Sequence, residues 1–102
     1  MRIIKRSALV AYAVKHKTAE NSLLRWATIV KAAEWTSLDD TRKTFPGADE
    51  VTLDSGNVVS IFNIAGNRYR LIVAIHYNRG MVSVRDFMTH AEYSKDRWKE
   101  RH

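Results

Sequence analysis

The short stretch from Met88 to Asp96, read as Met-Thr-His-Ala-Glu-Tyr-Ser-Lys-Asp, combines side chains that move protons with side chains that hold anions. His90 is a candidate for proton transfer, because an imidazole gains and loses a proton near neutral pH. Tyr93 could stack on a base or donate a proton, since a phenol is a poor base at neutral pH. Lys95 could hold a phosphate group. An apolar, strand-like run precedes the stretch, so these residues are expected where a strand ends.

A basic region precedes this stretch. The chain carries a net charge of +6, and no acidic residue occurs between Ser55 and Arg85. A basic excess attracts polyanions, although it also serves simply to keep a protein in solution. The segregation of arginines from carboxylates favours an anion-binding site over a mixed surface. The arginines of this region are Arg68, Arg70, Arg79 and Arg85.

Strand alternation predicts where these arginines point. Residues 67–77 place bulky apolar side chains at every second position, from Tyr69 to Tyr77, and that side should face the core. Arg68 and Arg70 then lie on the opposite, open face. A four-residue loop after this strand sets His76 across from Met81. The resulting register puts Arg85 beside Ile72 and Phe87 beside Arg70, and it places Asn63 with the arginines.

The remaining sequence supplies the elements that position this face. Apolar residues at helical spacing predict two helices, over 5–16 with Ser7 as a cap and over 18–35 with Thr18 as a cap. From Val51 onward, β-branched and aromatic runs separated by short turns predict three or four antiparallel strands. A short terminal helix capped by Thr89 and anchored by Trp98 follows. The predicted fold is α+β: two N-terminal helices packed on one face of a small twisted antiparallel sheet, with a short C-terminal helix, in a single domain of residues 1–102.

Several classes of protein and site are disfavoured by composition. The chain has no cysteine, which excludes disulfides and cysteine-based zinc sites and fits a reducing, cytoplasmic location. The histidines are scattered, so no metal site is predicted, and no motif indicates a cofactor. No apolar run reaches the roughly 20 residues that a membrane helix needs. The N-terminus lacks the small-residue cleavage site of a signal peptide and is taken as mature protein.

The second half of the chain resembles the HigB-type toxins of bacterial toxin–antitoxin modules, within the RelE superfamily. The pattern is a strand ending in Phe-Asn, a Gly-Asn turn, Tyr-Arg-Leu in the next strand, an Arg, and then Thr-His-x-Glu-Tyr. The likeness extends to the start of the chain and to the segment Phe45–Val51. Two departures are Asp86 and Ser94, the latter where the family commonly has Asp. The matching residues are Phe62, Asn63, Gly66, Asn67, Tyr69, Arg70, Leu71, Arg85, Thr89, His90, Glu92 and Tyr93.

The resemblance implies a RelE-like fold and metal-independent cleavage of mRNA, typically on the translating ribosome. It also implies a helix-turn-helix antitoxin that neutralises the toxin and helps to repress their operon. In such a reaction the neighbouring 2′-hydroxyl attacks the phosphate, so proton transfer and positive charge are needed. The predicted catalytic residues are His90 for proton transfer, Arg70 and Arg85 for the phosphorane, and Tyr93 as a proton donor or stacking partner. The predicted RNA-binding residues are Asn63, Arg68, Phe87 and Lys95.

Other interpretations of the same residues stay open. A superfamily member that poisons DNA gyrase is one alternative, although such relatives generally lack the set of Arg70, Arg85, His90 and Tyr93. A non-catalytic RNA-binding module that uses the same basic face is another, and it predicts salt-sensitive binding without cleavage. His90 could also be only a surface residue beside a helix start, and Tyr93 could simply pack against the sheet edge.

Overall fold

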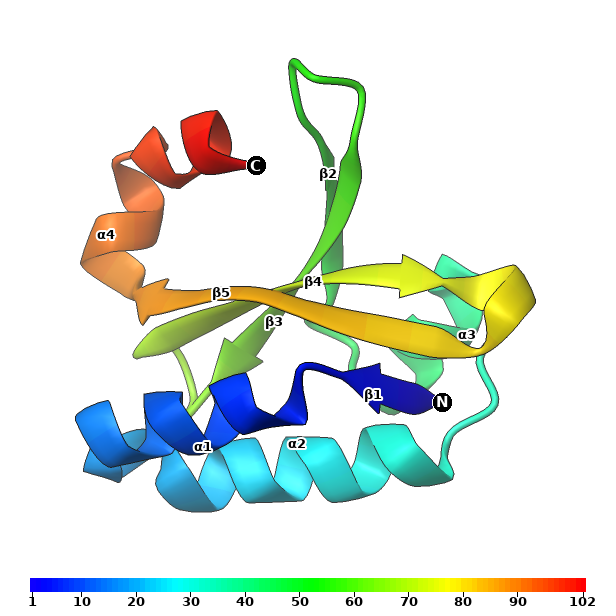
Figure 1. The fold of residues 1–102 in the computed structure, drawn as a ribbon, viewed down its shortest axis with the longest axis horizontal. Coiled ribbons are helices and arrows are strands. Elements are labelled where there is room, and N and C mark those ends of the chain that lie inside the picture. The colour runs from blue at the N-terminus through cyan, green and yellow to red at the C-terminus, as the bar shows by residue number, and fades with distance from the viewer.

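A twisted five-stranded sheet forms the centre of the molecule (Figure 1), which is described by a computed structural model covering residues 1–102. The strand order is β1-β5-β4-β3-β2, and every neighbouring pair is antiparallel except β1 and β5, which run parallel. The predicted α+β class is confirmed, and so are the strands predicted for the second half of the chain, but the sheet is mixed because β1 joins it in parallel. The first strand is free to pair in parallel because helices, not a hairpin, follow it. The strands are β1 (Arg2–Ile4), β2 (Asp49–Thr52), β3 (Val58–Ile64), β4 (Tyr69–His76) and β5 (Met81–Thr89).

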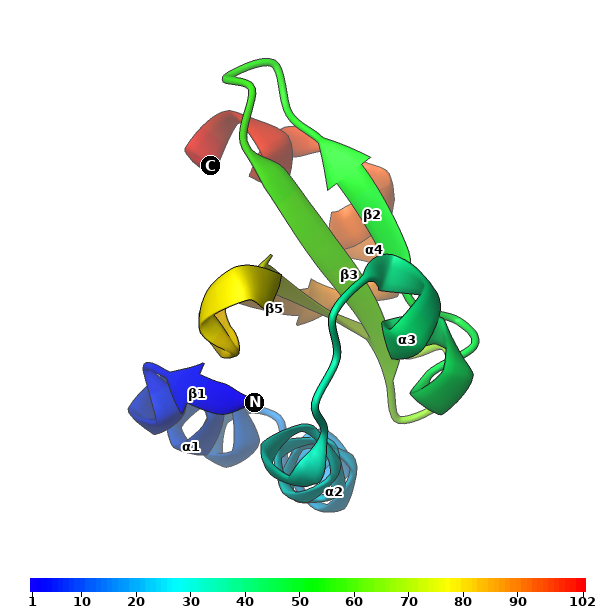
Figure 2. The same cartoon turned by 90° about the vertical axis from the view of Figure 1, so that its right-hand side faces the viewer.

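Two helices cover one face of the sheet, as predicted (Figure 2). They are α1 (Arg6–Lys15) and α2 (Glu20–Ala32), joined by the 3₁₀ turn η1 (Lys17–Ala19). The caps differ from the prediction. Helix α1 already begins at Arg6, so Ser7 is not its cap. The Thr18 hydroxyl hydrogen-bonds the Tyr69 hydroxyl at 2.6 Å instead of capping α2, and it thereby ties the helix connection to the sheet.

Shorter helices complete the fold. Helix α3 (Leu38–Thr44) has Ser37 as its N-cap, whose hydroxyl accepts a hydrogen bond from the Asp40 amide. The turn η2 (Tyr77–Arg79) joins β4 to β5. At the C-terminus, α4 (His90–Ser94) and the 3₁₀ helix η3 (Arg97–Arg101) fold back beside the β2–β3 hairpin, on the side of the sheet away from α1 and α2 (Figure 1).

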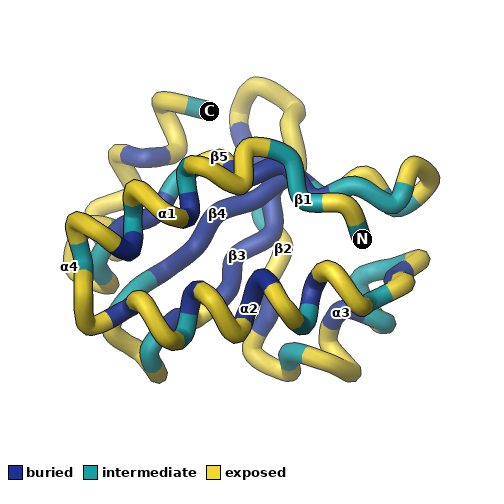
Figure 3. Tube along the Cα trace, turned by 60° about the horizontal axis from the view of Figure 1, so that its bottom comes forward, coloured by how far each residue is buried: buried dark blue, intermediate teal, exposed yellow.

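Both faces of the sheet therefore carry an apolar cluster, and the strands between them are buried (Figure 3). The helix-facing cluster contains Leu71 and Val73, with Tyr69, Ile75 and Tyr77 packed against it, which confirms the predicted inward side of β4. The second cluster is anchored by Trp98, which is 1% exposed. The face expected to be open is thus partly covered by the C-terminal segment. The second cluster consists of Leu53, Val59, Ile61, Ile72, Met88 and Trp98.

A bulge in β5 changes the expected register. His76 pairs with Met81 as predicted, but Ile72 lies opposite Asp86 and Val73 opposite Val84, which leaves Arg85 as the extra residue. The bulge reverses the side to which the later residues point. Phe87 consequently lies in the helix-facing core, where its ring stacks on Tyr69 at 5.1 Å between centroids. The prediction that Phe87 sits beside Arg70 as an RNA-stacking platform is therefore wrong.

Candidate functional site

The candidate site lies at the end of the sheet where β3 ends, β4 begins and β5 passes into α4. The turn between β3 and β4 has left-handed backbone at both Ala65 and Gly66, with φ of 53° and 68°, and glycine adopts this conformation without steric cost. The His90 amide donates a hydrogen bond to the Arg68 carbonyl oxygen at 2.8 Å, so the start of α4 is attached to this turn. The side chains of His90 and Arg68 are both exposed. The structure therefore brings together the turn and the helix start that the sequence motifs singled out.

Arg70 is the central cation of the site, and it is only 8% exposed. Its Nη1 donates to the carbonyl oxygens of Asn67 and Tyr69, and its Nη2 donates to Asn67 Oδ1 at 2.6 Å. No carboxylate forms an ion pair with it. All three acceptors are neutral, and a guanidinium has five N–H groups, so donors remain for another acceptor.

Tyr93 covers Arg70 from the C-terminal segment. The guanidinium carbon lies 5.7 Å from the centre of the Tyr93 ring, within the range of a cation–π contact. The ring also stacks on Trp98 at 5.2 Å, and Trp98 Nε1 donates to the Tyr93 carbonyl oxygen. Burial, with a contribution from the charge of Asp49, raises the pKa of the Tyr93 hydroxyl above its ordinary value, although Lys99 and Arg70 oppose the shift. Tyr93 is therefore protonated at neutral pH, as an ordinary phenol also is, and it can donate a hydrogen bond.

A capping box fixes the start of α4. The Thr89 hydroxyl accepts a hydrogen bond from the Glu92 amide, and the Glu92 carboxylate accepts one from the Thr89 amide. The predicted cap at Thr89 is confirmed. Ser94, the departure from the family pattern, donates its hydroxyl proton to the His90 carbonyl oxygen at 2.9 Å. The Ser94 contact holds the backbone carbonyl of His90, while the imidazole is exposed to solvent.

Two predicted RNA-binding residues flank this centre. Asn63 on β3 pairs with Arg70 on β4, as the alternation predicted, and its side chain is exposed. Gly47 lies close by, since a Cβ built on it would be 3.0 Å from Asn63 Nδ2. Lys95 follows α4 directly and is exposed. Asn63 and Lys95 both belong to the same end of the sheet as Arg70.

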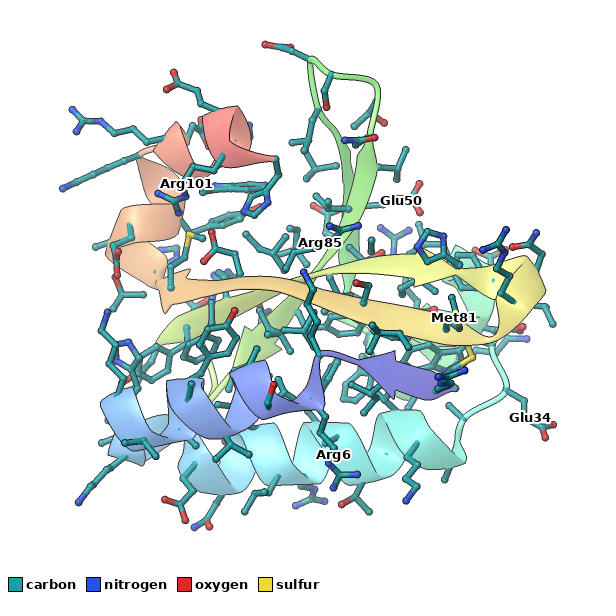
Figure 4. The ribbon with its side chains drawn as sticks, in the orientation of Figure 1. Arg6, Glu34, Glu50, Met81, Arg85 and Arg101 are labelled. Atoms are coloured by element: carbon teal, nitrogen blue, oxygen red, sulfur yellow. The ribbon has the colours of Figure 1, made fainter.

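Arg85 lines a pocket to which neither Arg70 nor Tyr93 contributes. It is the bulge residue of β5, and it shares this pocket of about 200 Å³ with Asn57, Arg101 and His102. Arg85 and Arg101 are on the side of the sheet away from α1 and α2 (Figure 4). Arg101 also forms an ion pair with Asp86. Arg70 does not line the pocket of Arg85 and shares no hydrogen-bond partner with it, and the C-terminal segment covers part of the face that was expected to be open.

Three contributors to these sites were not predicted from the sequence. Asn67 binds Arg70 through both its carbonyl groups, and the Gly-Asn turn motif was a signal for it. Trp98 was expected to anchor the tail, but its support of Tyr93 could not be read from spacing. Arg101 enters the Arg85 pocket from a segment that the sequence showed only as a solvated helix. No group of three or more His, Asp or Glu side chains is placed to hold a metal ion.

Comparison with known protein families agrees with these motifs. Residues 19–96 match the family model described as HigB_toxin, the RelE-like toxic component of a toxin–antitoxin system. The chain belongs to the HigB toxin family. Because proteins of this family are the toxic components of toxin–antitoxin systems, the expected partner of this chain is an antitoxin. No curated protein matches the toxin closely enough to count as a relative. No helix of the toxin combines the length and apolar character needed to cross a membrane.

Proposed function

We propose that this toxin is an endoribonuclease that cleaves mRNA, on the translating ribosome, by metal-independent attack of a 2′-hydroxyl on the neighbouring phosphate. The observation that carries the proposal is the buried guanidinium of Arg70, which has no carboxylate partner. Burying a charge is costly unless an opposite charge accompanies it. A phosphate of the substrate would supply that charge and would accept hydrogen bonds from the remaining guanidinium donors.

The neighbouring residues suit the other tasks of the reaction. Arg70 would stabilise the negative charge of the developing phosphorane, and this stabilisation would be the electrostatic contribution to catalysis. His90, exposed at the start of α4, would transfer a proton. Tyr93, whose phenol is protonated at neutral pH, would donate a proton or stack on a base. Asn63, Arg68 and Lys95 would hold the flanking RNA through its phosphates and base edges.

Arg85 receives a different role from the one its sequence position suggested. Because it lines a pocket with Arg101 and Asn57 to which Tyr93 and Arg70 do not contribute, it would bind a different phosphate of the RNA. Its exposed guanidinium forms no ion pair. The partner antitoxin is proposed to be a helix-turn-helix protein, as the sequence resemblance implies.

Expression of the toxin without its antitoxin tests the proposal. We expect growth arrest and new 5′ ends within translated mRNAs, and we expect Arg70→Ala and His90→Ala each to relieve the arrest while the protein stays folded. Full toxicity of the double variant would contradict the assignment. Growth arrest with intact mRNA and inhibited DNA supercoiling would favour a gyrase poison. Salt-sensitive RNA binding without cleavage would favour a binding module.

A further inference from the structure

An apolar groove runs along the outer side of the helix layer, between α1 and α2. It has a volume of about 270 Å³ and is lined mainly by aliphatic side chains. Three of these, Val10, Val14 and Leu24, are 60%, 69% and 54% exposed (Figure 3 shows this side of the helices). The buried residues that form its floor are Leu9, Ala13 and Leu23.

The exposure of these residues is concentrated rather than scattered. The chain has four large hydrophobic residues that are strongly exposed, and only Val58 lies outside the groove. Val10 and Val14 are four positions apart on α1, so they stand side by side on one helix face. Single exposed apolar residues are normal, but a contiguous apolar patch beside a groove marks an interaction site. The packing of α1 and α2 on the sheet is already satisfied by other residues, so these side chains are not needed for the core.

The helix pair that forms the groove carries an excess of positive charge. Residues 5–32, which span both helices, contain six Lys or Arg residues and a single acidic residue, Glu20. Arg6 lines the groove and extends toward α2 (Figure 4), and Glu20 is the one acidic residue of the lining. A second copy of the same chain would bring this positive charge against itself. A nucleic acid would match the charge but would leave the aliphatic residues unsatisfied. An apolar centre with a basic surround instead complements an acidic polypeptide.

We propose that this groove binds an amphipathic, acidic helix of the antitoxin. Such a helix would place apolar residues at i, i+3 or i+4 and i+7 into the groove and its carboxylates toward the surrounding lysines and arginines. The groove lies on the helix layer, whereas Tyr93 and Trp98 lie on the other side of the sheet. An antitoxin that docks here holds the toxin through a surface that the proposed catalytic residues do not share.

The test uses the double variant Val10→Asp, Val14→Asp, with Val58→Asp as the matched control at a 47% exposed site outside the groove. The probe is the product of the open reading frame adjacent to the toxin gene that relieves toxin-induced growth arrest. Calorimetric titration should show its affinity for the double variant reduced at least about 30-fold, as expected for loss of an interface hot spot. The control should bind normally. In cells, the double variant should stay toxic but escape neutralisation.

Two further measurements separate the contribution of charge to antitoxin binding from the contribution of groove shape. Val14→Lys should weaken binding less than Val14→Asp, because a cation in the groove still attracts an acidic helix, and the wild-type affinity should fall with added salt. Unchanged affinity of the folded double variant would overturn the proposal. A double variant that binds the antitoxin normally but loses affinity for ribosomes or RNA would assign the groove to nucleic acid instead. Antitoxin binding is measured directly, so failure here is distinct from failure of the proposed cleavage activity.

Discussion

The guanidinium of Arg70 and the ring of Tyr93 form the contact that joins the sheet to the C-terminal segment, with 5.7 Å between the guanidinium carbon and the ring centre. The two residues are 23 positions apart in the sequence. The Arg70 guanidinium is held by its hydrogen bond to the side chain of the turn residue Asn67, and the Tyr93 ring is held by its stacking on Trp98. A change at either residue should therefore alter both the stability of the terminal segment and the chemistry proposed for the site.

Arg70→Lys should abolish most of the activity although it preserves the charge. A lysine lacks the planar fork that binds two Asn67 oxygens and a phosphate at once. Loss of those hydrogen bonds should also lower the free energy of unfolding by about 1–3 kcal/mol. Urea unfolding and mapping of mRNA 5′ ends measure the two effects. Arg79→Lys, at an exposed position in η2, is the control. Wild-type cleavage by Arg70→Lys would contradict the role given to the guanidinium.

His90→Gln should separate catalysis from folding. The side chain is exposed, and the contacts that fix this residue come from its backbone, so the melting temperature should stay unchanged. Loss of a positioned proton-transfer group should slow cleavage by about 10²–10⁴-fold. Single-turnover cleavage of a short RNA on programmed ribosomes measures the rate. His76→Gln, exposed at the far end of the sheet, should cleave normally, and a fully active His90→Gln variant would remove His90 from the mechanism.

Arg85→Ala should weaken RNA binding more than it slows the chemical step. Its pocket is separate from the contact between Arg70 and Tyr93, so the cleavage rate at saturating RNA should be nearly unchanged. Loss of one phosphate contact should reduce the salt dependence of binding by about one unit of slope. Filter-binding titrations over a range of salt concentrations measure this slope. A large fall in the saturated rate with unchanged affinity would return Arg85 to the catalytic group.

Asp86→Asn should destabilise the toxin at neutral pH and lose this effect in acid. Burial raises the pKa of the Asp86 carboxyl, but hydrogen bonds from His102, Arg101 and the Phe87 amide outweigh it and bring the pKa below its ordinary value. A carboxyl with a lowered pKa in the folded state stabilises the protein above the unfolded pKa of about 4, and this contribution disappears as pH falls through the folded value.

Unfolding curves of the wild type and of Asp86→Asn between pH 7 and pH 2 test this dependence. The difference in unfolding free energy should be largest near neutral pH, at about 1 kcal/mol, and should approach zero at the acid end. Asp54→Asn, at an exposed position in the β2–β3 loop, is the matched control and should show little difference at any pH. A stability difference between Asp86→Asn and the wild type that grows toward low pH would have the wrong sign.

Trp98→Ala should lower the free energy of unfolding by about 3–5 kcal/mol, because it removes a nearly fully buried side chain of the second apolar cluster. Trp98→Phe keeps an aromatic ring against Tyr93 and should cost clearly less. Chemical denaturation compares the two variants, and cleavage measured well below their melting temperatures tests whether Tyr93 stays in place. Equal stability of Trp98→Ala and the wild type would mean that the C-terminal segment does not hold the sheet face.

The sequence by itself determined the features that depend on near neighbours in the chain. Alternation within β4 was enough to place Leu71 and Val73 in the core, because successive side chains of any strand point to opposite faces. The caps at Ser37 and Thr89 were also predictable, since a capping hydroxyl bonds an amide three residues away. The cluster of motif residues at the end of the sheet followed from the same local patterns and from the resemblance to the HigB-type toxins.

Only the tertiary structure decided how those pieces meet. The bulge at Arg85 places the Phe87 side chain in the core. No local sequence pattern predicted the bulge, because a bulge depends on how β5 pairs with its neighbour β4. The burial of Arg70 depends on Tyr93 and Trp98, which reach it through folding of a remote segment. The parallel pairing of β1 likewise depends on a partner about 80 residues away in the chain. Contacts of this kind are set by global packing, which the spacing of residues in one segment does not encode.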